Sequence, residues 1–243
     1  MIGKTKKILI IGSAPDSVNA TKWKNISFDK IVAINNAWKV RKDWTNCIYP
    51  EDFPEHKRPK SSKTQTLHSS EEYVKAQNHF GGFVYAGGTM AFTAGYWVLY
   101  KFKPQIICYT GCDMVYTGEK THFYGKGKAD PLRKDKTLNN LLAKSARLEA
   151  IAFLNKCKIL NLSNILESNL TFPKVNVNDL ENAVKIHSNK FKEEKINLAL
   201  QKEKKTGYFI PDGKYWKQMD KFDQKEIKLI DELWLSSIHR NLD

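Results

Sequence analysis

Short apolar runs rich in β-branched residues alternate with segments of helical period over the first two thirds of the chain, and this alternation limits the fold more than any other feature. We predict buried strands over 7–12, 30–34, 46–49, 82–85, 105–109 and 158–162. Helices are predicted between them, over 90–102 and 138–156. Parallel neighbours need a crossover connection, which is usually a helix. The sequence therefore predicts an α/β fold with a mainly parallel sheet flanked by helices.

Two irregular segments interrupt this pattern, and the composition changes near its end. Residues 51–63 combine Pro with Lys, Arg and Glu, and residues 115–136 are rich in Gly, Lys and Tyr. Long loops in compact domains are often functional lids. Beyond about residue 173, Lys, Glu and Asn dominate, and helices are predicted over 180–204 and 223–239. We predict a catalytic domain over 1–172 with a lid over 115–136, followed by a helical C-terminal extension over 173–243. The extension is either a small second domain or an element for oligomerisation and acceptor binding, and a homo-oligomer is expected.

The chain is strongly basic, with 40 Lys and Arg against 26 Asp and Glu and a net charge of +14. This balance favours anionic partners such as nucleotides, nucleic acid or an acidic membrane surface. The basic residues are spread over the whole chain and are interleaved with acids in the extension, whereas nucleic-acid binders usually concentrate them on one face. Peripheral contact with an anionic glycolipid or membrane is therefore favoured over nucleic-acid binding, which stays open as an alternative.

Apolar run lengths and the cysteine content bear on the cellular compartment. No run approaches the roughly 18 apolar residues of a membrane span, and the apolar stretch before Gly12 is too short for the core of a signal peptide. Four scattered cysteines fit free thiols in a reducing compartment better than a disulfide framework. We expect a cytoplasmic protein, with any membrane contact at the inner face.

The turn after the first predicted strand, Gly12-Ser13-Ala14-Pro15-Asp16-Ser17, is the first candidate for ligand binding. A glycine at a strand end lets a ligand approach the backbone, and Ser or Asp can cap the next helix while its free N–H groups face an anion. The turn is neither the dinucleotide fingerprint nor a P-loop. Its simpler interpretation is an ordinary strand-to-helix turn.

Three further turns follow predicted strands, and ligands of open parallel sheets bind at the carboxyl ends of strands. Asn35 and Asn36 offer amide donors and acceptors, although either can also cap a helix. The glycines of the other two turns permit close contact with a sugar or phosphate, although Gly87 and Gly88 can also serve tight packing. Asp113 is expected to hold ribose hydroxyls, or else to cap its turn. The residues expected around one cleft are Gly12, Ser13, Pro15, Asn35, Gly87, Gly88, Thr89, Gly111 and Asp113.

The lid carries cations, phenols and one imidazole within a short span. They are Tyr116, Thr121, His122, Tyr124, Lys126, Lys128, Arg133 and Lys134. Cations and phenol hydroxyls can stabilise a phosphate leaving group, and a histidine with a reference pKa near 6.5 can accept a proton. A lone histidine is more often structural, but His122 follows Asp113 closely enough to face the same crevice. The chain has no Asp-x-Asp motif, so a metal-independent site is favoured.

These motifs resemble those of the sialyltransferases of glycosyltransferase family 42, which use CMP-sialic acid, and more loosely those of the motility-associated-factor glycosyltransferases. The resemblance covers roughly residues 7–162. The family's Gly-x-Gly-Pro-Ser turn corresponds to residues 12–17, its Asn after strand two to Asn35, its Ser-Gly turn to residues 87–89, and its Gly-x-Asp to residues 111–113. The resemblance implies a Rossmann-like α/β domain that holds CMP with these turns and needs no metal or separate cofactor.

The chain departs from the family pattern in the lid. The family places its catalytic His directly before the helix that follows the lid, where this chain has residues 139–142 and no His. The family's phosphate-binding Tyr stands two residues after Gly-x-Asp, where this chain has Val115, with Tyr116 one further on. His122 instead resembles the His of a Thr-His pattern in the motility-associated relatives.

We therefore expect a glycosyltransferase that moves an acidic sugar, such as sialic acid or a related keto-sugar acid, from a CMP-activated donor to a glycan or glycolipid acceptor. His122 is the expected general base, and Tyr116 and Tyr124 are expected to stabilise the departing CMP phosphate. Two alternatives stay open. One is a pyrophosphokinase of the pterin type that uses ATP and Mg, and the other is a basic nucleic-acid-binding protein.

Overall fold

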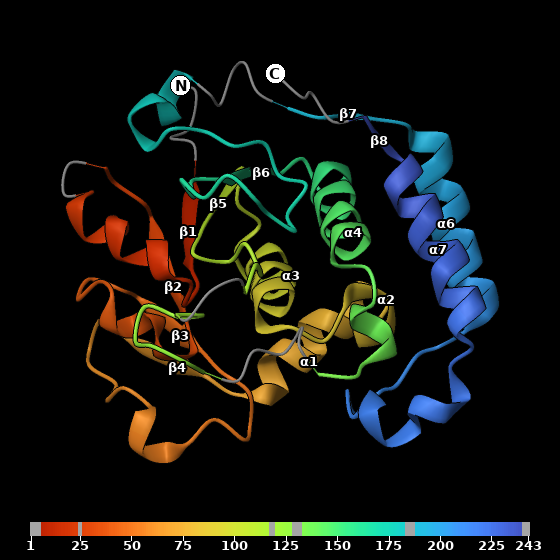
Figure 1. Cartoon of the computed structure of the whole chain (residues 1–243), viewed down its shortest axis with the longest axis horizontal. Coiled ribbons are helices and arrows are strands. Elements are labelled where there is room, and N and C mark those ends of the chain that lie inside the picture. Colours follow the sequence, from red (N-terminus) through yellow and green to blue (C-terminus); the bar gives the residue numbers. More distant parts are fainter. Residues whose placement is uncertain (1–5, 24–25, 117–119, 128–132, 183–187, 240–243) are drawn as a thin grey trace.

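A computed structural model describes residues 6–23, 26–116, 120–127, 133–182 and 188–239 (Figure 1). Its centre is a six-stranded sheet in the order β4-β3-β2-β1-β5-β6, in which every neighbouring pair is parallel. The strands are β1 (Lys7–Ile11), β2 (Lys30–Ile34), β3 (Asn46–Ile48), β4 (Thr66–His68), β5 (Ile106–Thr110) and β6 (Lys158–Asn161). The expected α/β Rossmann-like fold is confirmed.

The central strands are apolar throughout because both faces of the sheet are covered. Every residue of β1 and β5 is buried. Ile8 and Ile10 of β1 belong to one hydrophobic cluster, and Leu9 and Ile11 belong to another on the opposite face. This division follows from the alternation of side chains along a strand.

The two faces have different covers. One face packs against α1 (Ser70–His79), α2 (Phe83–Ala86), α3 (Met90–Phe102) and α4 (Leu141–Leu154), and the other against short 3₁₀ turns, chiefly η1 (Pro15–Lys22) and η2 (Asn35–Lys39). In the C-terminal extension, α6 (Glu193–Thr206) and α7 (Gln224–Ser236) form a pair, with α4 between this pair and the sheet (Figure 1). The strands β7 (Lys190–Phe191) and β8 (Ile238–His239) form a small antiparallel ribbon. The remaining 3₁₀ turns are η3 (Glu55–Lys57), η5 (Lys136–Leu138), η6 (Val177–Asp179) and η7 (Tyr215–Lys221).

The structure corrects three expectations. Residues 82–85 are not a strand, because Gly81 and Gly82 adopt positive φ angles of 97° and 91° and the chain then enters α2. The edge strand is β4, which sequence analysis did not assign, and α1 follows it. The first helix expected in the extension does not run over 180–204, because β7 precedes α6, which begins at Glu193.

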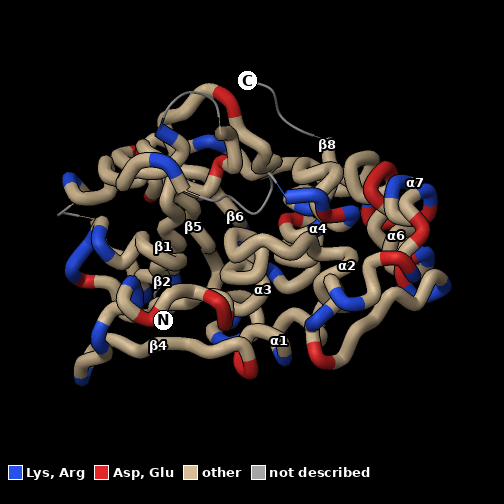
Figure 2. Tube along the Cα trace, turned by 60° about the horizontal axis from the view of Figure 1, so that its bottom comes forward, with Lys and Arg blue, Asp and Glu red and all other residues tan. Residues whose placement is uncertain are grey.

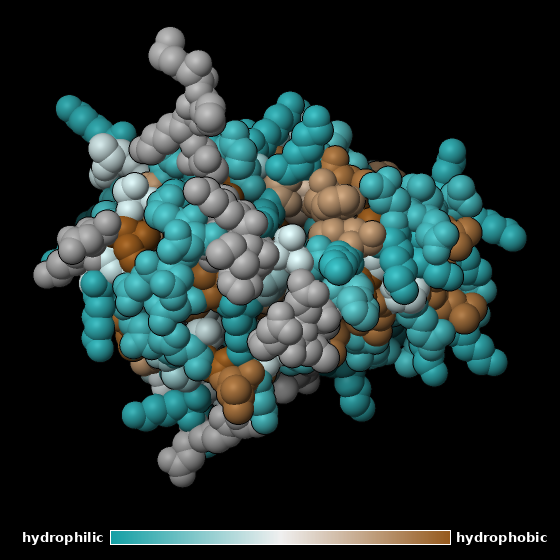
Figure 3. All heavy atoms as spheres, turned by 90° about the horizontal axis from the view of Figure 1, so that it is seen from above, coloured by the Kyte–Doolittle hydropathy of each residue, from teal (hydrophilic) through white to brown (hydrophobic). Residues whose placement is uncertain are grey.

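None of the helices in the described ranges is long and apolar enough to cross a bilayer. Basic residues are distributed over both the sheet and the extension (Figure 2). On the face seen from above, apolar side chains are interspersed among hydrophilic ones (Figure 3).

Buried charges join the extension to α4. Arg147 is fully buried, donates from Nε to Glu203 Oε1 on α6 at 2.7 Å, and donates from Nη1 to Tyr96 at 2.7 Å. Lys144 donates to Asp231 on α7 at 2.6 Å. Burial alone would lower the pKa of Arg147, but the adjacent Glu203 carboxylate raises it above its ordinary value. The guanidinium therefore stays charged and depends on Glu203.

Replacing Glu203 by Gln should destabilise the protein by about 3–5 kcal/mol, because the substitution leaves a buried guanidinium without its counter-charge. Urea unfolding measures this change. Glu226→Gln is the control, since Glu226 pairs with Lys202 at the surface and its loss should cost at most about 1 kcal/mol. Equal stability of the two variants would contradict this account of the α4–α6 contact.

Candidate functional site

A pocket of about 720 Å³ lies at the carboxyl edge of the sheet. Its wall combines the turns after β1, β2 and β5, the beginning of α3, the segment after β3 and part of the lid. The chain leaves β1 towards β2 on one side, whereas β5 pairs with β1 on the other side. The pocket is therefore at the topological switch point, where open α/β sheets bind their ligands.

Two glycines form a backbone floor at this point. A Cβ atom on Gly12 would overlap the carbonyl oxygen of Gly111, and one on Gly111 would lie 2.5 Å from Ser17 Cβ. The Gly12 N–H donates to the Thr110 carbonyl at 2.8 Å, and the Ala14 N–H donates to the Gly111 carbonyl at 3.0 Å. Only glycine permits this contact between the two turns, and it leaves a bare backbone surface that a ligand can approach closely.

Two asparagines on the pocket wall have unused acceptors. Asn35 has a left-handed φ of 52°, which Asn tolerates better than most residues, and Asn36 is only 6% exposed. Among the described residues, neither Asn35 Oδ1 nor Asn36 Oδ1 has a hydrogen-bond partner, although both atoms are buried. An unsatisfied buried acceptor costs about 1–3 kcal/mol. A ligand that presents N–H or O–H groups here would recover that cost.

The beginning of α3 supplies backbone donors to the same pocket. Thr89 caps the helix, and its Oγ1 accepts from the Phe92 N–H at 3.4 Å. Thr89, Met90 and Ala91 line the pocket. The first N–H groups of a helix have no intrahelical acceptor, and the helix dipole adds partial positive charge at this end. An anionic group such as a phosphate fits this position.

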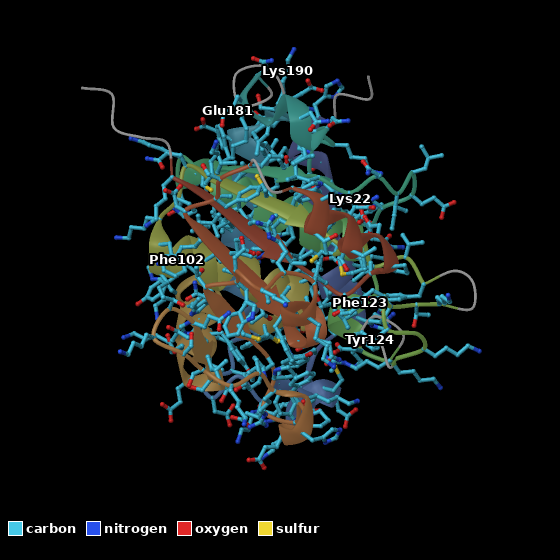
Figure 4. The ribbon with its side chains drawn as sticks, turned by 90° about the vertical axis from the view of Figure 1, so that its left-hand side faces the viewer. Lys22, Phe102, Phe123, Tyr124, Glu181 and Lys190 are labelled. Atoms are coloured by element: carbon cyan, nitrogen blue, oxygen red, sulfur yellow. The ribbon has the colours of Figure 1, made fainter. Side chains whose placement is uncertain are left out.

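The lid brings an imidazole to the pocket wall. The Phe123 N–H donates to the Ser13 carbonyl at 3.0 Å, which ties the lid to the β1 turn. His122 is 8% exposed, its Nδ1 lies 2.9 Å from Thr121 Oγ1, and its ring stacks on Tyr124 with centroids 5.0 Å apart. Phe123 and Tyr124 lie next to each other on the lid (Figure 4). Burial lowers the pKa of His122 below its ordinary value, which favours the neutral imidazole.

Most expected residues of the lid and strand ends meet in this pocket. Those that line it are Gly12, Ser13, Asn35, Thr89, Gly111, Tyr116, His122 and Tyr124, together with Thr121 and Lys126. Pro15 is exposed at the start of η1 and does not line the pocket. Arg133 instead donates to Asp135 at 2.9 Å. Lys134 is exposed and is not part of the pocket wall, and Lys128 lies outside the described residues.

Gly87 and Gly88 are packing glycines and do not line the pocket. A Cβ atom on Gly87, which has a φ of 81°, would lie 3.0 Å from Lys144 Cγ. One on Gly88 would overlap the Tyr215 hydroxyl. The close approach of Tyr215 from the extension explains the second glycine, so the packing alternative describes this turn.

Asp113 is also placed differently from expectation. It is fully buried, its Oδ1 accepts from Asn161 Nδ2 at 2.8 Å, and it does not line the pocket. Positive φ angles of 66° at Gly111 and 53° at Met114 set the path of this turn, whose residues Cys112 and Met114 line the pocket instead. The Asp113 carboxylate thus belongs to a buried polar network beside β6 and not to the wall that a ribose would contact.

Sequence analysis missed one part of the wall. The segment after β3 contributes Asp52, Phe53 and Lys57. Arg58 fixes this segment by donating to the Phe53 carbonyl at 2.9 Å, and Trp38 Nε1 donates to the Lys57 carbonyl at 3.0 Å. Two signals were available: the irregular composition of residues 51–63, which marks a long loop, and the position of this loop after a strand of a parallel sheet.

No family model, curated protein or solved structure matches the chain. The function must therefore be argued from the geometry of the pocket.

The pKa of His122 should be below 6.5, because the folded environment disfavours the imidazolium. The unfolded chain then binds more protons than the folded one near this pH, so this residue lowers stability as the pH falls below 6.5. A ¹⁵N NMR titration of labelled histidines measures the pKa, and His122→Gln assigns the resonance. A value above 6.5 would contradict the burial argument.

Proposed function

We propose that the protein is a glycosyltransferase that takes an acidic sugar, such as sialic acid or a related keto-sugar acid, from a CMP-activated donor. The observation that carries the proposal is that one pocket combines the unpartnered Asn35 and Asn36 acceptors, the beginning of α3 and the neutral His122. A nucleotide-sugar needs these three properties together: acceptors for its hydroxyl or amino groups, donors for its phosphate, and a base for the second substrate.

The nucleotide part of the donor fits the floor and the asparagines. The hydroxyls of a ribose or the amino group of a cytosine can donate to Asn35 Oδ1 and Asn36 Oδ1. The phosphate is placed at the beginning of α3, where the N–H groups of Met90 and Ala91 are oriented by the helix. Lys126 adds a positive charge to the wall.

His122 is the proposed general base. Its Nε2 accepts the proton of the acceptor hydroxyl, whose oxygen attacks the anomeric carbon of the donor sugar. The bond between that carbon and the phosphate oxygen breaks, and CMP leaves with the bonding electron pair. Tyr116 and Tyr124 then stabilise the phosphate charge through their hydroxyls. This role requires Nδ1 to carry the resting proton and to donate it to Thr121 Oγ1, which also accepts from the Gly127 N–H at 3.3 Å.

The proposed reaction needs no metal, because the phosphate charge is neutralised by helix N–H groups and lysines. Among the described residues of the pocket wall, Asp52 alone carries a carboxylate, so the wall offers few of the oxygen ligands that Mg²⁺ prefers. The acceptor is proposed to be a glycan or glycolipid hydroxyl.

CMP should raise the melting temperature of the protein in the absence of Mg²⁺, since a ligand at 100 times its dissociation constant stabilises by about 2.7 kcal/mol. Thermal shift with CMP, UMP, GMP and ATP, each with and without Mg²⁺, measures this. Stabilisation by ATP and Mg²⁺ alone would instead support a pyrophosphokinase. Salt-dependent binding of arbitrary DNA without a nucleotide effect would support a nucleic-acid-binding protein.

His122→Gln should reduce turnover of a CMP-sugar by about 10²- to 10⁴-fold, the usual contribution of a general base, and leave CMP affinity nearly unchanged. Single-turnover kinetics and calorimetry give the two quantities. Tyr124→Phe tests the proposed role of the Tyr124 hydroxyl at the phosphate, because it removes only that hydroxyl and keeps the ring that stacks on His122. An active His122→Gln protein would exclude His122 as the base.

A further inference from the structure

The loop between α6 and α7 presents exposed aromatic rings among lysines. Trp216 is 57% exposed and Phe209 is 47% exposed, although both types are usually buried. Trp216 is the most exposed of the six tryptophans, all of which are described. We call Phe209, Trp216 and the nearby Lys205, Lys214 and Lys217 the aromatic-lysine surface.

The two parts of the loop that precede these rings or carry them pack on consecutive residues, Gly82 and Phe83. A Cβ atom on Gly82 would lie 3.4 Å from the ring of Phe209. Phe83 stacks on Tyr215, the residue before Trp216, with centroids 5.9 Å apart. Asn78 Nδ2 also donates to the Pro211 carbonyl at 2.7 Å, which fixes the tip between them.

Hydrogen bonds from Tyr215 and Lys136 hold the loop beneath this surface against the rest of the protein. The Tyr215 hydroxyl donates to Asp135 Oδ2 at 2.8 Å, and Lys136 Nζ donates to the Met219 and Phe222 carbonyls at 3.1 and 2.9 Å. Tyr215 is buried, whereas the adjacent Trp216 is held out of the core. The Trp216 ring contacts the Tyr215 ring edge-on, with centroids 5.6 Å apart, and this contact restricts the indole before it binds.

The end of α6 and the loop together carry a small excess of positive charge. Residues 204–223 contain five lysines and three aspartates. Among the described residues, Lys205, Lys214 and Lys217 take part in no ion pair. Tryptophan is enriched at membrane interfaces, and lysines beside it are attracted by anionic lipid headgroups. Single-stranded nucleic acid also binds lysines and stacks on exposed aromatic rings, so a failure to bind anionic vesicles would favour it over a bilayer.

The base of the surface reaches the beginning of the pocket wall through Tyr215. The Tyr215 hydroxyl occupies the position where Gly88 would carry a side chain, and Thr89, the next residue, lines the pocket. We propose that the aromatic-lysine surface binds an anionic phospholipid bilayer, with the pocket next to the lipid surface. If the proposed function holds, the acceptor is then a lipid-linked sugar at that surface.

Vesicle flotation tests the proposal with the full chain and vesicles of phosphatidylcholine alone or with 30% phosphatidylserine as the probe. We expect binding to the anionic vesicles, a blue shift of the tryptophan emission that Trp216→Ala removes, and at least about tenfold weaker binding for Trp216→Ala and for the double variant Lys214→Glu/Lys217→Glu. Lys42→Glu/Lys63→Glu is the matched control, because both lysines are exposed on the β3–β4 side and carry the same charge change.

Equal binding to neutral and anionic vesicles, or equal loss in the control, would overturn the proposal. So would unchanged binding of Trp216→Ala, which would leave only diffuse attraction by the net charge. Circular dichroism and melting temperature confirm that each variant is folded. Vesicle binding needs neither donor nor turnover, so a failed CMP assay with intact vesicle binding would reject the glycosyltransferase function and keep the membrane surface.

Discussion

The contact between the turns after β1 and β5 is the constraint on which the site depends. Gly12 and Gly111 pack backbone to backbone, and a side chain on either would collide with the other turn or with Ser17. Because β1 and β5 are neighbours in space and far apart in sequence, this contact sets the switch point, from which the chain departs to both sides. The pocket is the space above the two glycines, and the lid reaches it through the bond from Phe123 to Ser13.

Contacts of the C-terminal extension with α4, the lid and the turn before α3 help to position this site. Buried pairs of Arg147 with Glu203 and of Lys144 with Asp231 hold α6 and α7 on α4. The Tyr215 hydroxyl reaches Asp135 at the end of the lid and closes over Gly88 at the beginning of α3. The lid and the α3 wall are therefore positioned partly by Tyr215, which follows Asp135 by 80 positions along the chain. An extension with this contact is part of the framework of the pocket.

The sequence predicted those features that depend on local pattern. The strands β1, β2, β5 and β6 are buried apolar runs, and the parallel topology then brings Gly12, Asn35 and Gly111 to one edge. The sequence could not distinguish a buried strand from a short buried helix at residues 82–85, because so short an apolar run shows neither the helical nor the strand periodicity. The polar edge strand β4 has no apolar signal. The placement of Asp113 depends on the positive φ angles of Gly111 and Met114. The part of the pocket wall at Lys57 depends on hydrogen bonds from Arg58 and Trp38. No residue pattern in the sequence specifies either of these features.

A buried polar atom without a hydrogen-bond partner indicates a binding site only when its residue also lines a cavity. Gln77 is buried, and neither its Nε2 nor its Oε1 has a partner among the described residues, yet it does not line the pocket. Asn35 and Asn36 share this deficit, but they are among the residues that line a cavity large enough for a nucleotide, and Asn35 has a left-handed backbone. The left-handed backbone of Asn35 and the two unsatisfied acceptors together lower the stability of the folded protein by a few kcal/mol. A ligand that donates to both amides returns the hydrogen-bond part of that cost, so the same residues that lower the stability of the fold favour binding.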